Sequence, residues 1–144
     1  MMTTSANALP WLGLSAVVIA LDQATKALAL DMLQPAAPHA VIPGMLNWTL
    51  AFNTGAAFSF LADAGGWQRW GFSVLAVVVS AILVVWLART PRSDWRTSLP
   101  LALVIGGALG NLIDRLRLGH VTDFIQVYWR DWFFPAFNVA DPAI

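Results

Sequence analysis

The sequence predicts an α-helical integral membrane protein, a small bundle of three transmembrane helices with a short β-hairpin-like segment between the first two. Composition supports this fold class, because 58% of the residues are hydrophobic and only 11% are charged, whereas soluble domains carry roughly 25% charged residues. In addition, three stretches approach the ~20 apolar residues that cross a bilayer as a helix. Because the chain has 144 residues, we expect one membrane-embedded domain over residues 1–144.

Composition also excludes several classes of function. The formal net charge is zero, so the chain lacks the basic footprint of a nucleic-acid-binding protein. Cysteine is absent, which excludes disulfides and thiol catalysis. His39 and His120 lie far apart and form no metal-ligand pattern, so we expect neither a metal nor another cofactor. All 8 acidic residues are Asp, and acid–base chemistry would therefore depend on Asp.

The first predicted span covers about residues 9–30. Its apolar part, residues 9–21, is too short to cross a bilayer, so the span must include Asp22 and Lys26. A cleaved signal peptide is the alternative. We favour a retained helix because residues 1–8 contain no Lys or Arg, whereas a signal peptide begins with positive charge.

The second and third spans are clearer. Residues 71–88 contain no charge, and Trp67 and Trp86 lie near the two ends, as is typical of aromatic side chains at membrane interfaces. Residues 97–113 are apolar and run directly into Asp114. We expect both segments to span the membrane.

Basic residues predict the orientation of the spans. The short loop after the second span contains Arg89, Arg92 and Arg96, and such loops remain in the cytoplasm. The N-terminus is then cytoplasmic, and residues 31–66 and 119–141 face outward. In a bacterium, this is the periplasmic side of the inner membrane.

The outer segment between the first two spans contains the predicted hairpin. Residues 47–52 are rich in strand formers, residues 53–55 form a turn signal, and residues 56–61 would return as the second strand. We expect residues 121–132 to be of mixed structure. The hairpin aromatics would dip into lipid or cover a pocket; they are Trp48, Phe52, Phe58 and Phe60.

Asp22 and Lys26 are four residues apart and therefore share one face of a helix. They are either a self-neutralising pair that lets the helix insert or a pair that faces a polar cavity. We favour the second interpretation because charges inside a membrane segment are costly and usually functional.

The third span ends in a second polar group. Gly106 and Gly110 form a G-x-x-x-G pattern that permits close helix packing, and Asn111, Asp114 and Arg115 share one helical face. They form either a packing seam ending in an interfacial ion pair or one polar wall of a site. Together with the first-span pair, the charges sum to zero, which predicts a network across helices that holds a site without reacting.

Asp123 and Asp141 are the candidate reactive residues. Each lies in an apolar stretch near the outer surface, where a lone Asp is more often a helix cap or a turn residue. Asp141 followed by Pro142 is indeed typical of a helix start, with Asp141 as the cap. Two carboxyl groups in one site, however, share a proton, so one can activate water while the other donates to a carbonyl oxygen, as in aspartic proteases.

Five motifs resemble those of the bacterial lipoprotein signal peptidases, or signal peptidase II. They are D-Q-A-T-K at 22–26, F-N-T-G-A-A-F-S at 52–59, G-G-A-L-G-N-L-I-D-R at 106–115, V-T-D-F at 121–124 and F-N-V-A-D at 137–141. The resemblance implies an aspartic peptidase of the inner membrane. Its substrates are prolipoproteins that carry diacylglycerol on a cysteine, and it cuts just before that cysteine.

The resemblance also implies roles for individual residues and partners. Asp123 and Asp141 match the catalytic pair. Besides the substrate we expect contact with membrane lipid, inhibition by globomycin and a monomeric state. The residues that would bind substrate or brace the site are Asp22, Lys26, Asn53, Gly107, Asn111, Asp114, Arg115, Asn138 and Ala140.

The sequence departs from the family in two respects. Members have a fourth transmembrane helix after the second aspartate, so we expect this chain to be a C-terminally truncated piece, and many have Ser at the position of Pro142. The alternative function is a small membrane transport or assembly subunit. A transport path would need polar residues through the whole membrane depth, whereas the second span and the inner half of the third are apolar.

Overall fold

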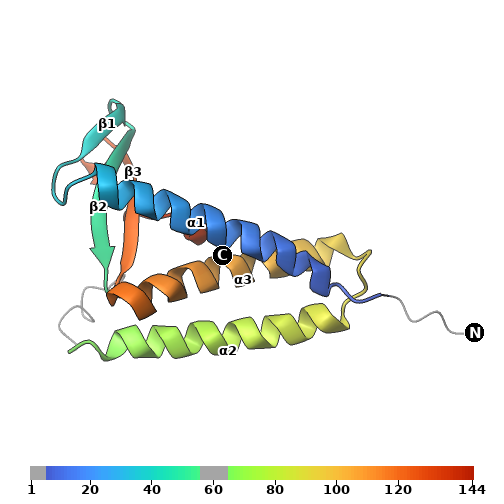
Figure 1. Cartoon of the computed structure of the whole chain (residues 1–144). Helices are drawn as coiled ribbons and strands as arrows, with labels where there is room; N and C mark the ends of the chain where they lie inside the picture. The colour runs from blue at the N-terminus through green and yellow to red at the C-terminus, as the bar shows by residue number, and fades with distance from the viewer. Residues whose placement is uncertain (1–5, 56–64) are drawn as a thin grey trace, which may run out of the picture.

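The computed structural model describes residues 6–55 and 65–144. Its three long helices lie alongside one another, with α2 antiparallel to the other two (Figure 1). Each is long and apolar enough to span a membrane, which confirms the predicted fold class. A 3₁₀ turn, Leu9–Trp11, precedes α1, and the three helices are α1 (Leu12–Met32), α2 (Trp67–Arg89) and α3 (Trp95–Leu118).

Helix α3 extends beyond its predicted apolar run at both ends. At its start, the carboxylate of Asp94 accepts a hydrogen bond from the backbone N–H of Thr97 at 3.2 Å, which is a side-chain N-cap. At its end, Gly119 takes the left-handed conformation with φ of 81°, which ends the helix without strain on a side chain. Asp114 and Arg115 therefore lie inside α3, one turn before its end.

Helices α1 and α3 pack closely at the predicted glycine pattern. A Cβ atom at Gly106 would lie 2.9 Å from the carbonyl oxygen of Ser15, so only glycine permits this approach. The hydroxyl of Ser15 donates to the carbonyl of Ala102 at 2.6 Å. Leu87 of α2 and Ile105 of α3 form an apolar core further along the bundle.

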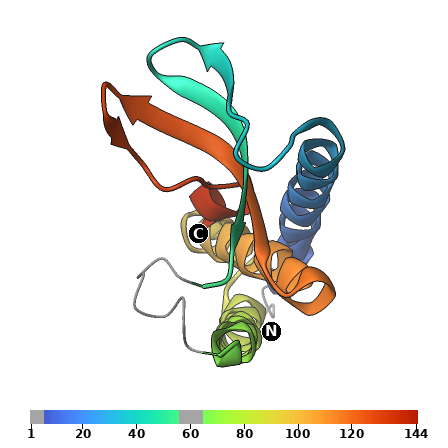
Figure 2. The same ribbon diagram turned by 90° about the vertical axis from the view of Figure 1, so that its left-hand side faces the viewer.

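A four-stranded antiparallel sheet lies at the end of the bundle where α1 ends and α2 begins (Figures 1 and 2). The predicted strand around residues 47–52 is present, but it pairs with β1 and β3. The second half of the predicted hairpin, with Phe58 and Phe60, lies outside the described residues. The strands, in spatial order, are β1 (His39–Ile42), β2 (Leu46–Asn53), β3 (Val121–Trp129) and β4 (Trp132–Phe133).

The expectation of mixed structure over residues 121–132 was wrong. Residues 121–129 form one continuous strand, because β2 supplies a hydrogen-bonding partner that is about 70 residues distant in sequence. Local alternation does not reveal this strand, since its first four residues are all buried.

The chain then returns to the bundle through Phe137. The backbone N–H of Phe137 donates to the carbonyl of Ile125 at 3.0 Å, and the N–H of Ile125 donates back at 2.9 Å. A short helix follows, α4 (Ala140–Ala143), which lies between the sheet and α3 (Figure 2). It packs so closely that a Cβ atom at Gly107 would lie 2.5 Å from the carbonyl oxygen of Ala140. The end of the chain is thereby packed against α3.

Candidate active site

One asparagine joins the two candidate carboxylates. Asp123 lies in β3, opposite Ala51 of β2, and Asp141 is the second residue of α4. The side-chain amide of Asn138 donates to Oδ1 of Asp123 at 2.8 Å, and its backbone N–H donates to Oδ2 of Asp141 at 3.0 Å. The predicted convergence of the two aspartates is therefore present in the structure.

Asn138 also changes how the start of α4 is understood. Its Oδ1 accepts from the backbone N–H of Asp141 at 3.1 Å while the carboxylate of Asp141 accepts from the N–H of Asn138. This reciprocal pair is a capping box, with Asn138 as the cap and Asp141 three residues later. The prediction that Asp141 is the cap was wrong. The second carboxylate oxygen of Asp141 accepts from the amide of Asn111 at 2.9 Å.

Asp123 lies in surroundings that favour its neutral form. Only 3% of its surface is exposed, and the pKa of its carboxyl group is raised from 3.8 to about 7. Burial is the main cause, and the nearby charge of Asp141 adds to it. Hydrogen bonds from Asn138 and Asn53, and the positive charge of Lys26, offset part of this rise. Near neutral pH, Asp123 can therefore carry a proton.

Asn53 reaches Asp123 from the end of β2. Its backbone pairs with Val121 of β3, two residues before Asp123. This register sets the side chains of Asn53 and Asp123 close together. The side-chain oxygen of Asn53 accepts from the N–H of Gly55 at 2.8 Å, and the turn that this bond forms fixes the side-chain direction. The amide can then serve as a donor to Asp123.

A buried ion network lies beneath the two aspartates. Nζ of Lys26 lies 2.7 Å from Oδ2 of Asp22 and 3.1 Å from Oδ2 of Asp114, and it donates to Oδ1 of Asn111 at 3.0 Å. The side chains of the three charged residues are at most 3% exposed. The predicted Asp22–Lys26 pair is present, and it is extended across the helix interface to α3.

The predicted network of four charges was wrong for Arg115. Within the described part of the chain, Arg115 forms no ion pair at salt-bridge distance. Its guanidinium lies over the ring of Phe72, 5.2 Å from the centroid, and it lines the same cavity as Asp141. Arg115 therefore contributes positive charge to the cavity, whereas the ion pairs across the two helices are made by Lys26.

The two carboxylates of the ion network hold the backbone beside the candidate pair. Oδ1 of Asp22 accepts from the N–H of Ala140 at 3.0 Å, and Oδ2 of Asp114 accepts from the N–H of Thr122 at 2.9 Å. Each therefore binds the amide directly before a candidate catalytic residue, Asp141 or Asp123. Such buried charged acceptors make strong, directional hydrogen bonds.

A cavity of about 310 Å³ opens between α2 and α3 beside Asp141. Most of its lining is apolar and comes from the two helices, and its polar residues are Asn111, Arg115 and Asp141. A ligand in this cavity would therefore contact one carboxylate while its apolar part rests on the helices.

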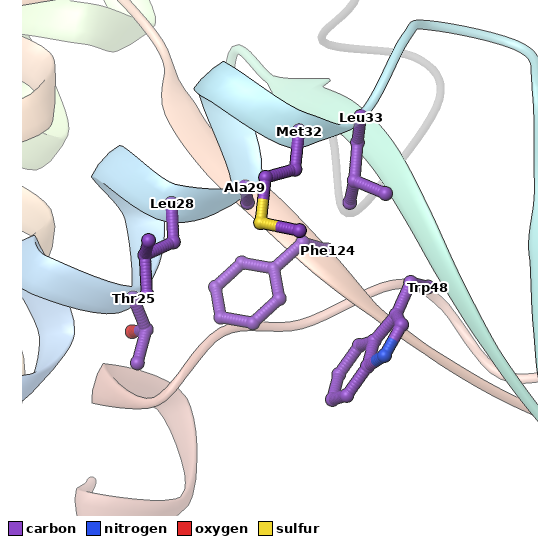
Figure 3. Close-up of a pocket in the computed structure, with 7 residues that line it drawn as sticks. All are labelled: Thr25, Leu28, Ala29, Met32, Leu33, Trp48 and Phe124. Carbon is purple, nitrogen blue, oxygen red and sulfur yellow. The ribbon is translucent and has the colours of Figure 1, made fainter.

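On the opposite face of β3, Phe124 belongs to an apolar cluster. Side chains alternate along a strand, so Phe124 points away from the face that carries Asp123. Figure 3 shows Phe124 and Trp48 beside the last turns of α1, where they line a second cavity of about 260 Å³. Phe124 packs with Ala29 and Leu50 in a small core, which fixes β3 against α1.

Sequence reasoning missed three contributions, one of them a second role of a glycine that it had assigned to helix packing. A Cβ atom at Gly110 would lie 2.6 Å from Oδ2 of Asp22, so this glycine admits the carboxylate as well as the helix. Thr122 contributes through its backbone N–H, which no sequence pattern reveals. Gln23 donates to both Asp22 and Asp114. In the sequence, Gln23 was visible as a further polar residue inside the first span and as a member of the motif at residues 22–26.

No group of three or more His, Cys, Asp or Glu side chains with the placement of metal ligands occurs among residues 6–55 and 65–144.

The chain is similar to one described family over nearly its whole length. The model of signal peptidase (SPase) II matches residues 14–144. Lipoprotein signal peptidase of Xylella fastidiosa (strain M12) is 57% identical over 141 residues, which are 98% of this chain and 84% of that protein. Lipoprotein signal peptidase of Xanthomonas campestris pv. campestris (strain 8004) is 59% identical over 138 residues, 96% of this chain and 83% of its own length.

Two solved structures are similar to the whole fold. Both are described as bacterial membrane enzymes solved by the in meso method. The first has a TM-score of 0.80 and 28% sequence identity, and the match covers 99% of this chain and 85% of that one. The second has a TM-score of 0.77 and 28% identity, with 99% and 90% covered.

Proposed function

The chain belongs to the signal peptidase II family, whose members remove signal peptides from lipoproteins, and we propose that it does so with Asp123 and Asp141 as its catalytic pair. It is a membrane protease with several spanning helices. The observation that carries the catalytic assignment is the sharing of Asn138 by the two carboxylates. Through that contact a buried Asp123 and a half-buried Asp141 share one site, and the charge of Asp141 acts on Asp123.

The environments of the two carboxyl groups support different roles. Asp141 accepts hydrogen bonds from Asn111 and from the N–H of Asn138, and these two donors orient its carboxylate beside the cavity. The raised pKa of Asp123 favours its neutral form. We therefore assign the proton of the resting pair to Asp123.

The reaction follows from these protonation states. The carboxylate of Asp141 takes a proton from a water molecule, and the water oxygen bonds to the carbonyl carbon of the scissile peptide. Asp123 donates its proton to the carbonyl oxygen, which forms a tetrahedral intermediate. When the C–N bond breaks, the leaving nitrogen takes the proton now held by Asp141, and Asp123 regains one from the hydroxyl group as the carboxylic acid product forms.

The cavity beside Asp141 supports a lipid-bearing substrate. Its lining is largely apolar side chains of α2 and α3, and both helices are long enough to span a bilayer. A diacylglyceryl-modified prolipoprotein can approach from within the membrane, with the bond just before its lipidated cysteine at Asp141. A globomycin-type inhibitor would occupy the same cavity, and membrane lipid would fill it in the resting enzyme.

The polar residues gather at one end of the bundle, and this supports a periplasmic site. Arg89, Arg92 and Arg96 lie at the opposite end, in and beside the loop between α2 and α3, and basic loops remain cytoplasmic. We therefore place the protein in the bacterial inner membrane with its N-terminus in the cytoplasm. We expect a single copy to suffice, because both aspartates and their donors come from one chain.

A transport subunit is disfavoured by the same distribution. In the described residues, the inner part of the bundle is filled by the apolar side chains of Leu87, Leu101 and Ile105. A path for ions needs polar side chains through the full membrane depth. An assembly subunit, the other alternative, would not require two coupled carboxyl groups.

Cleavage of a synthetic diacylglyceryl lipopeptide tests the proposal. The variants Asp123→Asn and Asp141→Asn should each lose activity by roughly 10²- to 10⁴-fold, with membrane insertion unchanged. Asp131→Asn is the matched control, because Asp131 lies between β3 and β4 at the exposed tip of the sheet. Normal cleavage by either dyad variant would refute the catalytic assignment, and dye-detected ion flux in liposomes would favour the transport alternative.

A further inference from the structure

We propose that Gln23 is a positioning residue for the reaction, because it joins the two carboxylates that hold the backbone on either side of the catalytic pair. The inference rests on the proposed function of Asp123 and Asp141. It concerns a side chain that contacts neither of them.

The chain holds its catalytic pair through two separate clasps. In the first clasp, Asp22 of α1 binds the N–H of Ala140 at 3.0 Å, which sets the start of α4. In the second, Asp114 of α3 binds the N–H of Thr122 at 2.9 Å, which sets β3. The separation of Asp123 and Asp141 therefore depends on the separation of the two clasps.

Two side chains join the clasps, and Gln23 is one of them. Nε2 of Gln23 lies 3.3 Å from Oδ2 of Asp22 and 3.1 Å from Oδ1 of Asp114. It also donates to the carbonyl oxygen of Gly110 at 3.1 Å. The second joining side chain is Lys26, which contacts both carboxylates from the other side. The two carboxylates, Asp22 and Asp114, are thus bridged twice, once by an ammonium and once by an amide.

The amide of Gln23 supplies neutral N–H donors and a contact with the backbone of α3, neither of which Lys26 provides. Two carboxylates face one ammonium, so neutral N–H donors are needed for the remaining oxygen lone pairs. Gln23 also contacts the backbone of α3 at Gly110, which fixes the rotation of the Asp22 carboxylate relative to that helix. Lys26 can follow a small shift of either carboxylate because its stem is flexible, whereas the planar amide, whose two N–H groups are shared among three acceptors, resists the shift.

A change in the separation of the two clasps would alter both the reaction rate and the electrostatic coupling of Asp123 and Asp141. Misplacement of a catalytic group by about 1 Å can cost roughly 100-fold in rate. When Asp123 and Asp141 lie further apart, the charge of one also acts less on the pKa of the other, because Coulomb repulsion falls with distance. The charged groups that act on Asp123 are Asp141 of α4, Lys26 of α1 and Arg115 of α3, and a change at Gln23 removes none of them.

The test is Gln23→Met, which keeps the length of the side chain but removes its donors. Gln34→Met is the matched control, since Gln34 is exposed beyond the end of α1. With the diacylglyceryl lipopeptide, we expect kcat to fall about tenfold in Gln23→Met while KM stays within about twofold. The alkaline limb of its kcat/KM profile should move to lower pH, because Asp123 is less coupled to Asp141. The control should match the wild type in all three quantities.

A second variant separates positioning from folding. Gln23→Asn keeps the amide, adds no bulk and shortens its reach by one methylene, so it should fold and show the same loss of kcat and the same shift. Unchanged kcat and an unchanged alkaline limb in both variants would overturn the inference. A loss of folded protein with normal kcat per folded molecule would overturn it too, since Gln23 would then be purely structural. If Asp123→Asn is inactive in the same assay, these outcomes leave the proposed function intact.

Discussion

At the scale of single residues, Asn138 has the largest number of roles in the site. Its side-chain amide donates to Asp123, to the carbonyl of Thr122 and to Asn111, and its oxygen caps α4. It is fully buried, so each of these groups would lose its partner in a dry environment if Asn138 were removed. Asn138 therefore determines both the position of Asp141 and the environment of Asp123.

We predict that Asn138→Ala lowers activity and stability together. The buried partners left unsatisfied should cost about 1–3 kcal/mol in unfolding free energy, and cleavage should fall by at least about tenfold. The matched control is Asn47→Ala, because Asn47 is also buried but hydrogen-bonds to Gln126 in the sheet. Thermal unfolding in detergent and lipopeptide cleavage measure the two effects. An Asn138→Ala protein with wild-type turnover would contradict the linking role.

Asp123 should make the protein less stable as the pH rises. The pKa of its carboxyl is raised from 3.8 to about 7 in the folded protein, so the folded state binds the proton more tightly than the unfolded state does. The resulting stabilisation is complete below about pH 4 and is lost as the pH rises through about 7.

The isosteric variant Asp123→Asn tests this linkage. It avoids the cost of a buried charge, so at about pH 8 it should be more stable than the wild type by up to a few kcal/mol, because one pKa unit corresponds to about 1.4 kcal/mol. The difference should shrink as the pH falls to about 5. Thermal unfolding across this range is the measurement, with Asp131→Asn as the control. Equal stability at every pH would contradict the raised pKa of Asp123.

At the scale of secondary-structure elements, the contact between α1 and α3 determines where the charged residues meet. Gly106 lets the helices approach, and Gly110 leaves room for the carboxylate of Asp22. The ion network can form only because these two positions lack side chains. The glycine pattern was visible in the sequence, but its second purpose depended on the rotation of α1, which only the packed pair fixes.

We predict that Gly110→Ala disrupts the network. A Cβ atom there would lie 2.6 Å from Oδ2 of Asp22, so the carboxylate or the helix must move, at a cost of about 1–3 kcal/mol. The shift should also reduce cleavage, because Asp22 holds the N–H of Ala140. Gly13→Ala is the control, since a Cβ atom on that residue of α1 would meet nothing within 4 Å. Full activity in Gly110→Ala would show that the helix contact tolerates the methyl group.

The sheet and α4 show the limit of what local sequence predicts. Apolar length predicts the second and third spanning helices, and the first once Asp22 and Lys26 are included, because the bilayer fixes their size. Strand β3 was missed, since its pairing with β2 is set by residues about 70 positions away. The convergence of Asp123 and Asp141 was expected from the sequence, but the contacts that bring them together were not. It depends on backbone bonds between Phe137 and Ile125 and on the cap at Asn138, and neither leaves a periodic signal.

At the scale of the whole molecule, polar and apolar groups are separated along the bundle. The ion network and the candidate pair lie toward the end that carries the sheet, whereas the opposite end packs around Leu87 and Ile105. The placement of Asp22, Lys26 and Asp114 near one face followed from the span positions and the arginine loop. Their ion pairs could not be predicted, because Lys26 and Arg115 are both cations, and only the packed structure shows that Lys26 is the one that pairs with Asp22 and Asp114.

The orientation can be measured because the chain contains no cysteine. Ser93→Cys, in the loop between α2 and α3, and Asp131→Cys, at the tip of the sheet, introduce single exposed thiols. In intact spheroplasts, a membrane-impermeant maleimide should label Asp131→Cys, whereas Ser93→Cys should react only after permeabilisation. The reverse pattern would place the candidate site in the cytoplasm.

The central claim is that Asp123 and Asp141 form one coupled pair that shares a proton, and infrared titration of the carboxyl stretch tests it most directly. In the wild type, we expect a protonated carboxyl band that is absent from Asp123→Asn and disappears with a midpoint at about pH 7. In Asp141→Asn, the midpoint of that band should fall, because the repelling charge is gone while burial remains. A band from Asp123 that titrates near its ordinary value, or one that Asp141→Asn leaves unchanged, would contradict the coupled pair.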